Sequence, residues 1–189
     1  TYTAGICIIY NGSNGSTYAD ELIINNCVNN GEIEGDTVAG IIGNSSGNLK
    51  LSDCENNGAI NGRYSAGGIA QCIENKNSNE AEVSNCINNG NVFGGAEAAG
   101  IIDYAEGITV TNCINNGNIS SNGYVGGIFS YTSSVKGTGL VNNGKISGLE
   151  DIGGISAYDE GNSIFIKLYN TGVIDEENIG AQVSNLVKL

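Results

Sequence analysis

The chain of 189 residues contains no histidine, proline, methionine or tryptophan, and only 14% of its residues are charged. Without histidine it cannot build a serine or cysteine triad of the usual kind, and the common zinc motifs lose a ligand type. Arg63 is the only arginine, although an enzyme that cuts acidic polysaccharides would need several basic groups. No apolar run is long enough to span a bilayer, so we expect no membrane insertion.

The charges that are present are unbalanced: 20 Asp and Glu face 7 Lys and Arg, a formal net charge of -13. Such a chain repels phosphate backbones, so we expect no nucleic-acid partner and no docking on anionic membranes. It has no initiating Met and no basic segment followed by an apolar one. We therefore expect residues 1–189 to be a single domain that is a fragment of a longer protein, with further domains in the same parent chain.

What the sequence has in abundance is repetition. Asn-Asn-Gly ends at Gly31, Gly58, Gly90, Gly117 and Gly144, with a degenerate copy at Gly172. These glycines are 27 or 28 residues apart, except for one interval of 32. A second box of a small residue, Gly and Ile follows with its glycine at Gly40, Gly68, Gly100, Gly127 and Gly154, and a weak copy lies at Ile179-Gly180-Ala181. An earlier box, Ala4-Gly5-Ile6, lies 35 residues before Gly40, which indicates an insertion over residues 11–20, and an insertion over residues 75–80 accounts for the interval of 32. The fixed phase of the two boxes indicates one structural unit per repeat.

Apolar residues recur at fixed positions in each unit. The residue two places after the first glycine is Ile33, Ile60, Val92, Ile119, Ile146 or Ile174. Two more aliphatic segments complete the repeat, one before Asn-Asn-Gly and one starting at the box isoleucine. Three short β-rich segments separated by turns predict three strands per repeat. Stacked repeats would pair each strand in parallel with its copy. The sequence thus predicts an all-β, right-handed parallel β-helix (β-solenoid) of five to six coils of about 27 residues.

The paired asparagines should line tight corners, because Asn and Gly both tolerate the left-handed backbone region. In register, their amides can hydrogen-bond from coil to coil. Four of the six cysteines also fall in one column, at Cys27, Cys54, Cys86 and Cys113, and Leu140 and Leu168 take this position in later repeats. A column that accepts either Cys or Leu favours buried free thiols. A disulfide between neighbouring coils stays open as an alternative, and the spacing fits no zinc motif, so we expect no metal site.

One column suggests a binding face. Four residues past the box glycine lie Tyr104, Tyr131 and Tyr158, each 27 residues from the next, and Phe129 lies two residues before Tyr131. If the box isoleucines point inward, strand alternation points these tyrosines outward. We assign Tyr104, Tyr131, Tyr158 and Phe129 as the candidate ligand-binding residues, able to contact sugar rings or peptide side chains. The alternative is that the rings turn inward or are covered.

No catalytic residues can be assigned. Carboxylates cluster at Glu150-Asp151, Asp159-Glu160 and Asp175-Glu176-Glu177, in segments expected to be turns, where solvated charges keep a repeat protein soluble. Two of them on adjacent coils could act as an acid–base pair, but nothing in the spacing holds them together. Calcium could also bind at such oxygen-rich turns, although the glycine-rich calcium signature of other solenoids is absent. We expect no cofactor.

The unit also resembles a known repeat. The segment from Val83 to Val92 followed by Ala99-Gly100-Ile101 is similar to GLUG-type repeats of bacterial cell-surface, adhesin-like proteins, in which a Gly-Leu-x-Gly box alternates with an Asn-Cys-x-x-x-Gly-x-Val box. The resemblance covers roughly residues 22–182. Here Ile replaces Leu, and the final Gly survives only as Gly43. The resemblance implies a β-solenoid in an exported bacterial protein and carries over no catalytic residue.

Composition, repeat and resemblance together predict a non-catalytic module on the extracellular cell surface. It would act in adhesion or as a spacer, with host or matrix glycans or extracellular proteins as partners. The alternative is a polysaccharide-active β-helix enzyme, either a lyase or a glycoside hydrolase. That alternative requires a groove with three or more converging carboxylates and a basic residue. A pure spacer predicts no exposed aromatic column.

Overall fold

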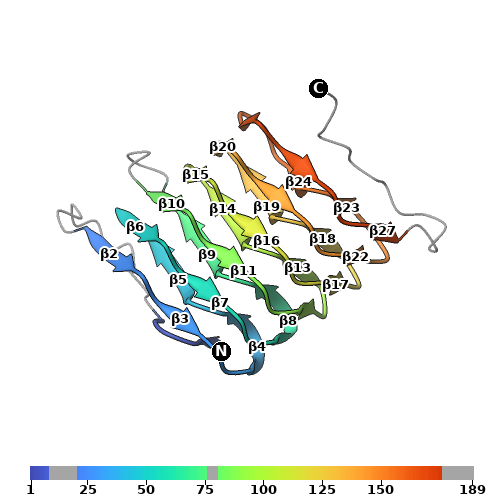
Figure 1. Ribbon diagram of the computed structural model, residues 1–189, viewed down its shortest axis with the longest axis horizontal. Coiled ribbons are helices and arrows are strands. Elements are labelled where there is room, and N and C mark those ends of the chain that lie inside the picture. The colour runs from blue at the N-terminus through green and yellow to red at the C-terminus, as the bar shows by residue number, and fades with distance from the viewer. Residues whose placement is uncertain (9–20, 76–80, 176–189) are drawn as a thin grey trace.

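The computed structural model describes residues 1–8, 21–75 and 81–175. Both expected insertions, apart from Asn75, lie outside these residues, as do the weak last box and the carboxylates Glu176 and Glu177. The described chain winds into stacked turns in which every strand pairing is parallel, and the turns follow one another from the N-terminal to the C-terminal end (Figure 1). The predicted all-β solenoid with a repeat of about 27 residues is confirmed. No helix in these ranges is long and apolar enough to cross a membrane.

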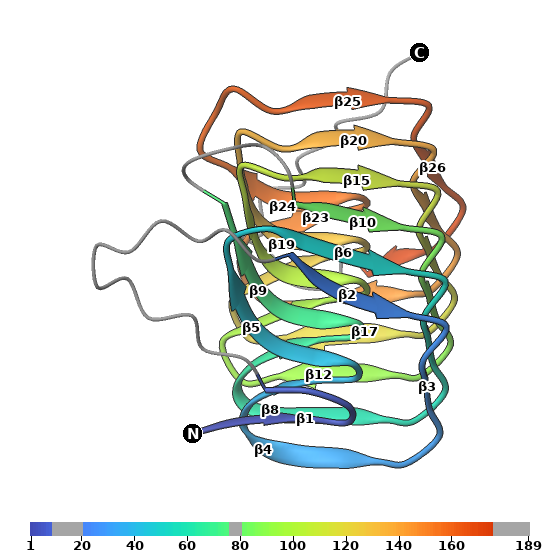
Figure 2. The same ribbon diagram turned by 90° about the vertical axis from the view of Figure 1, so that its left-hand side faces the viewer.

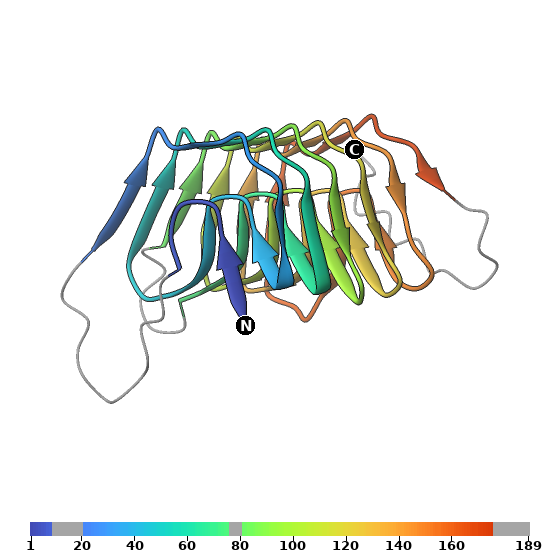
Figure 3. The ribbon, with the colours of Figure 1, turned by 90° about the horizontal axis from the view of Figure 1, so that it is seen from below.

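Each turn contributes to four parallel sheets, here called A, B, C and D (Figures 2 and 3). Sheet C contains β2 (Leu22–Asn25), β6 (Leu49–Ser52), β10 (Glu82–Ser84), β15 (Thr109–Thr111), β20 (Lys136–Thr138) and β25 (Ile164–Ile166). Sheet D contains the two-residue strands β3 (Val28–Asn29), β7 (Glu55–Asn56), β11 (Ile87–Asn88), β16 (Ile114–Asn115), β21 (Val141–Asn142) and β26 (Tyr169–Asn170).

Sheet A follows the Asn-Asn-Gly corner, and in the later turns its strand folds back on itself. The second strand of each such turn, at Glu97–Ala99, Tyr124–Gly126 and Ile152–Gly153, is here called the returning half of sheet A. Sheet A contains β1 (Tyr2–Ala4), β4 (Ile33–Ala39), β8 (Ile60–Gly67), β12 (Val92–Gly94), β13 (Glu97–Ala99), β17 (Ile119–Ser121), β18 (Tyr124–Gly126), β22 (Ile146–Ser147), β23 (Ile152–Gly153) and β27 (Ile174–Asp175). Sheet B closes the turn with β5 (Ile42–Ser46), β9 (Ala70–Glu74), β14 (Ile102–Glu106), β19 (Phe129–Ser133) and β24 (Ser156–Asp159).

The three expected strands correspond to sheets C, A and B, and sheet D is the addition. Sheet D is separate from sheet C because one residue between them adopts a left-handed backbone conformation, and the chain changes direction at that residue. That residue is Asn26, Asp53, Asn85 or Asn112 in the first four turns, with φ between 53° and 56°. The expectation for Asn-Asn-Gly was therefore wrong in one respect. None of the described asparagines or glycines of these boxes is left-handed, and a Cβ on Gly90 would lie 1.9 Å from the carbonyl oxygen of Gly58 in the turn below. Close stacking of the turns, not backbone handedness, requires glycine there.

The interior is divided into two apolar clusters. The larger contains Leu51, Val83, Ile102 and Phe129 together with the cysteine column. The smaller contains Ile33, Ile60, Val92, Ile119 and Ile146, packed against the returning half of the sheet A strands.

Buried asparagines stack beside the box glycines. Asn29, Asn56, Asn88 and Asn115 each donate a side-chain amide hydrogen to the Oδ1 atom of the next copy at 2.7 Å. The box glycine leaves room for this ladder, since a Cβ on Gly100 would lie 2.4 Å from Asn115 Cγ. The predicted coil-to-coil asparagine ladder is confirmed.

Candidate functional site: the tyrosine column and the corner beside it

The tyrosine column, Tyr104, Tyr131 and Tyr158, lies on the outer surface of sheet B. In β14, Ile102 and Ala105 are buried in the core, whereas Tyr104 and Glu106 are only partly buried. Tyr104 pairs in register with Tyr131, and Tyr131 with Tyr158. The side chain of Tyr158 is 43% exposed. The expected outward direction of the column is therefore found, because the strand alternates between core and surface from this position onward.

The rings of the column stack on one another. The centroids of Tyr104 and Tyr131 are 4.7 Å apart with 7° between the ring planes, and those of Tyr131 and Tyr158 are 5.3 Å apart with 29° between the planes. Within the column, each ring therefore covers a face of its neighbour. The ring edges and hydroxyl groups remain as the surface that a partner can reach.

Carboxylates accept hydrogen bonds from two of the hydroxyls. Tyr104 Oη donates to Glu106 Oε2 at 3.0 Å, and Tyr131 Oη donates to Glu160 Oε2 at 2.7 Å. The bond to Glu160, followed by desolvation, raises the pKa of Tyr131 to about 12. Desolvation, followed by the bond to Glu106, raises the pKa of Tyr104. Both tyrosines are thus neutral donors at physiological pH, and the column has a carboxylate border.

Phe129 is not part of this face, which corrects its assignment as a ligand-binding residue. Its side chain is fully buried and packs in the core, with its ring centroid 6.1 Å from that of Phe165. The reason is a local break in alternation. The pairing of β14 with β19 joins Ile102 to Phe129 and Tyr104 to Tyr131 but skips the residues between them. Both Ile128 and Phe129 consequently face inward, and a pattern of strict alternation misplaces Phe129.

The skipped residues Gln71, Asp103 and Ser130 are buried, and together with Ser65 and the half-buried Glu97 of sheet A they form a polar cluster, here called the A–B corner. Ser130 Oγ donates to Asp103 Oδ1 at 2.5 Å, and Gln71 Nε2 donates to Asp103 Oδ2 at 3.2 Å and lies 3.3 Å from Ser65 Oγ. Asp103 is fully buried, and this desolvation raises its pKa to about 7, with hydrogen bonding by Ser130 acting in the opposite direction. The carboxyl of Asp103 therefore titrates close to neutral pH.

The returning half of sheet A forms the other wall of this corner. Glu97 in β13 is close enough to Asp103 to contribute to its raised pKa, and desolvation raises the pKa of Glu97 as well. One turn further, the ring of Tyr124 in β18 lies 5.9 Å from that of Tyr158. Tyr124 thus connects the returning half of sheet A to the tyrosine column, and Asp103 of the A–B corner directly precedes Tyr104 in β14.

Sequence reasoning missed Gln71, Glu97, Asp103 and Tyr124. A signal was available for two of them. The residue after the box isoleucine is also apolar in Ile101-Ile102 and Ile128-Phe129. Two adjacent inward-facing residues interrupt the alternation of the strand, so the residue that follows them is left out of the regular pairing. Asp103 and Gln71 both occupy that position. Glu97 and Tyr124 reach the corner only because the sheet A strand folds back, and no local pattern reveals that.

The cysteines are free thiols, and those at positions 54, 72, 86 and 113 are buried. Hydrogen bonding to Cys113 is the main cause that raises the pKa of Cys86, to about 12. Cys72 takes the tyrosine position one turn before Tyr104, and burial raises its pKa. Across the described ranges, no group of three or more His, Cys, Asp or Glu side chains is arranged to hold a metal ion.

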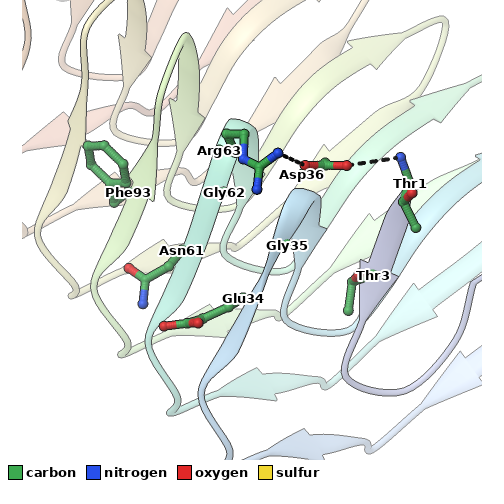
Figure 4. Close-up of a pocket in the computed structure, with 9 residues that line it drawn as sticks. All are labelled: Thr1, Thr3, Glu34, Gly35, Asp36, Asn61, Gly62, Arg63 and Phe93. Atoms are coloured by element: carbon green, nitrogen blue, oxygen red, sulfur yellow. Dashed lines mark ion pairs between the residues drawn. The ribbon is translucent and has the colours of Figure 1, made fainter.

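A second feature is a surface hollow of about 480 Å³ over sheet A, on another part of the molecule (Figure 4). Thr3, Glu34, Asn61 and Phe93 lie along its lining, and Arg63 pairs with Asp36 at 3.2 Å, with the amino group of Thr1 also 3.6 Å from Asp36. Of the two carboxylates that line it, Asp36 is already paired. The three converging carboxylates required by the polysaccharide-enzyme alternative are not assembled among the residues of this hollow.

The comparisons with known proteins give no family for this chain. No protein-family model matches it, and no curated protein is similar enough to count as a relative. The resemblance to GLUG-type repeats therefore stays a prediction, and function has to be argued from the surface just described.

Proposed function

We propose that this chain is a non-catalytic module of an extracellular, cell-surface protein, and that it binds its partner through the tyrosine column. The observation that supports this proposal is the outward, in-register stack of Tyr104, Tyr131 and Tyr158 on sheet B. Tyrosine is enriched in binding surfaces because it offers a large rigid ring and a polar tip at low entropic cost. The ring contacts would stabilise a spacer as well, but a spacer has no use for exposed ring edges and hydroxyl groups.

The solenoid suits this role mechanically. Each turn pairs with its neighbours through parallel sheets and through the buried asparagine ladder, so the outer residues are held at fixed spacing. A rigid array loses little conformational entropy when it binds, and several weak contacts can then act together. The predicted exported location agrees with the GLUG-type resemblance and with the acidic, low-charge composition. The partner class is a glycan or a protein of the host or the matrix.

The test is a glycan and extracellular-matrix protein array probed with the wild-type protein and with the triple variant Tyr104→Ala, Tyr131→Ala, Tyr158→Ala. Circular dichroism establishes that the variant is folded. We expect the wild type to bind at least one array component and the variant to lose that binding. Binding that the variant retains would move the site away from the column, and no binding by either protein would support the spacer function instead.

A further inference from the structure

The stacking of the tyrosines limits what the column can recognise. A sugar ring packs against the face of an aromatic side chain, but the rings of the column cover one another's faces within the stack. A flat platform for neutral sugars is therefore small, at most the outer faces of the first and last rings. Recognition has to depend on the ring edges, the hydroxyl groups and the groups beside them.

The groups beside the rings are acidic. The described strands of sheet B and of the returning half of sheet A contain no Lys or Arg. The same strands and the residue after β24 supply the carboxylates Glu74, Glu97, Asp103, Glu106, Asp159 and Glu160. The described strands of this face thus carry one sign of charge, which attracts partners of the opposite sign and repels acidic glycans.

The A–B corner also has more hydrogen-bond acceptors than donors. Gln71 is 92% buried, since its exposed fraction is 8%, and its Oε1 atom has no hydrogen-bond partner among the residues that the structure describes. Its Nε2 group, by contrast, faces Asp103 and Ser65. An unpaired buried carbonyl oxygen costs free energy until a donor reaches it. The raised pKa values of Asp103 and Glu97 have the same physical origin, because within residues 1–8, 21–75 and 81–175 no cation compensates their loss of water.

From this geometry we infer that the tyrosine column and the A–B corner together bind a Lys- and Arg-rich segment of a partner protein. This inference rests on the proposed function and names its partner class. Lysine and arginine side chains carry several donors and no acceptor, on stems long enough to pack along ring edges. Their charge pairs with the half-buried Glu97 and the exposed Glu160. A donor group that packs beside Glu97 also approaches the buried acceptors of the corner, which lie behind it.

The test is binding of a fluorescently labelled peptide in which Lys and Arg alternate with Gly and Ser, measured by anisotropy at near-physiological salt. The peptide with Glu and Asp in place of the basic residues serves as a negative control. The site variant is Glu97→Gln with Glu160→Gln. Its matched control is Glu34→Gln with Glu82→Gln, which removes the same charge from exposed positions on sheets A and C. Circular dichroism and thermal melting check the fold of both variants.

We expect the wild type to bind the basic peptide and not the acidic one. The site variant should weaken binding by about fivefold or more, and the control variant by less than about twofold, because salt screens charges that lie outside the contact. Equal weakening by the two variants would overturn the inference, since it would show attraction by net charge alone.

Two further outcomes separate this inference from the function on which it rests. If the basic peptide does not bind but the array yields a ligand that requires the tyrosines, the partner class is wrong and the proposed function stands. If the peptide does not bind and no array ligand requires the tyrosines, both fail.

Discussion

Asn88 donates its side-chain amide hydrogen to Asn115 Oδ1 at 2.7 Å, in a position where both side chains are fully buried. Asn115 repeats the contact with Asn142 and also donates to the carbonyl oxygen of Gly117. Each side-chain amide therefore forms hydrogen bonds with the preceding turn, with the following turn and with the backbone of its own corner. A buried polar network of this kind is stabilising only as long as every member is paired.

Replacing Asn115 by alanine should therefore be costly. Asn88 loses an acceptor and Asn142 loses a donor, both away from water, so we expect a loss of about 2–4 kcal/mol in the free energy of unfolding. Asn116→Ala is the matched control. Asn116 forms an equivalent ladder bond, to Asn89 at 2.9 Å, but in an exposed position, so its loss should cost less than about 1 kcal/mol. Urea denaturation measures both, and equal costs would contradict a dominant role for burial.

Asp103 should make stability depend on pH. Its pKa is about 7 in the folded protein and near 3.8 in an unfolded chain, so the folded state holds the proton more tightly. Between these two values stability falls as pH rises, and the full penalty is present above about pH 7. Asp103→Asn cannot ionise. Relative to the wild type it should be more stable at pH 8 by about 1–4 kcal/mol, and the difference should shrink towards pH 4.

Thermal unfolding across this pH range tests the Asp103 prediction. Glu106→Gln, a carboxylate on the same strand that is only partly buried, is the comparison variant. A difference between Asp103→Asn and the wild type that does not vary with pH would show that Asp103 does not titrate in this range.

The thiols should differ in reactivity. Cys54 and Cys86 are buried and their pKa values are raised, Cys54 mainly by hydrogen bonding to Cys86, so little thiolate forms. Cys7 and Cys27 are only partly buried. In the native protein we expect iodoacetamide to label Cys7 and Cys27 at least about tenfold faster than Cys54 and Cys86. Peptide mass spectrometry follows the order, with urea-unfolded protein as the reference in which all sites react; early labelling of Cys86 would refute the prediction.

Phe129 should behave as a core residue. Phe129→Ala removes a fully buried ring from the larger apolar cluster, and we expect a cost of about 3–5 kcal/mol. Tyr131→Ala, two residues away on the surface, should cost about 1–2 kcal/mol, mostly from the lost ring contacts. If Phe129→Ala does not fold, Phe129→Leu provides a milder variant with a cost near 1 kcal/mol. Similar losses in the free energy of unfolding for Phe129→Ala and Tyr131→Ala would contradict the inward placement of Phe129.

The repeat pattern predicts most of the core, because the same column is apolar in every turn. Ile33, Ile60, Val92, Ile119 and Ile146 all lie in one cluster, as their shared position predicts. It also predicts the register that stacks Tyr104 on Tyr131, since equal spacing in a parallel solenoid places equivalent residues on adjacent strands. Gly137 stands in a column that is otherwise mostly apolar. The structure accommodates it because the ring of Phe165 in the next turn fills the space that a larger side chain at position 137 would occupy.

By itself, then, the sequence determined the solenoid, its repeat length and the positions that stack from turn to turn, because these depend only on period and on residue type. It did not determine the A–B corner. One extra inward residue at Phe129 shifts the alternation of its strand, and the fold-back of sheet A brings Glu97 to Asp103. Whether a carboxyl is solvated or buried depends on segments that are close in space and separate along the chain. Only the tertiary structure therefore decided the charge and the chemistry of this face.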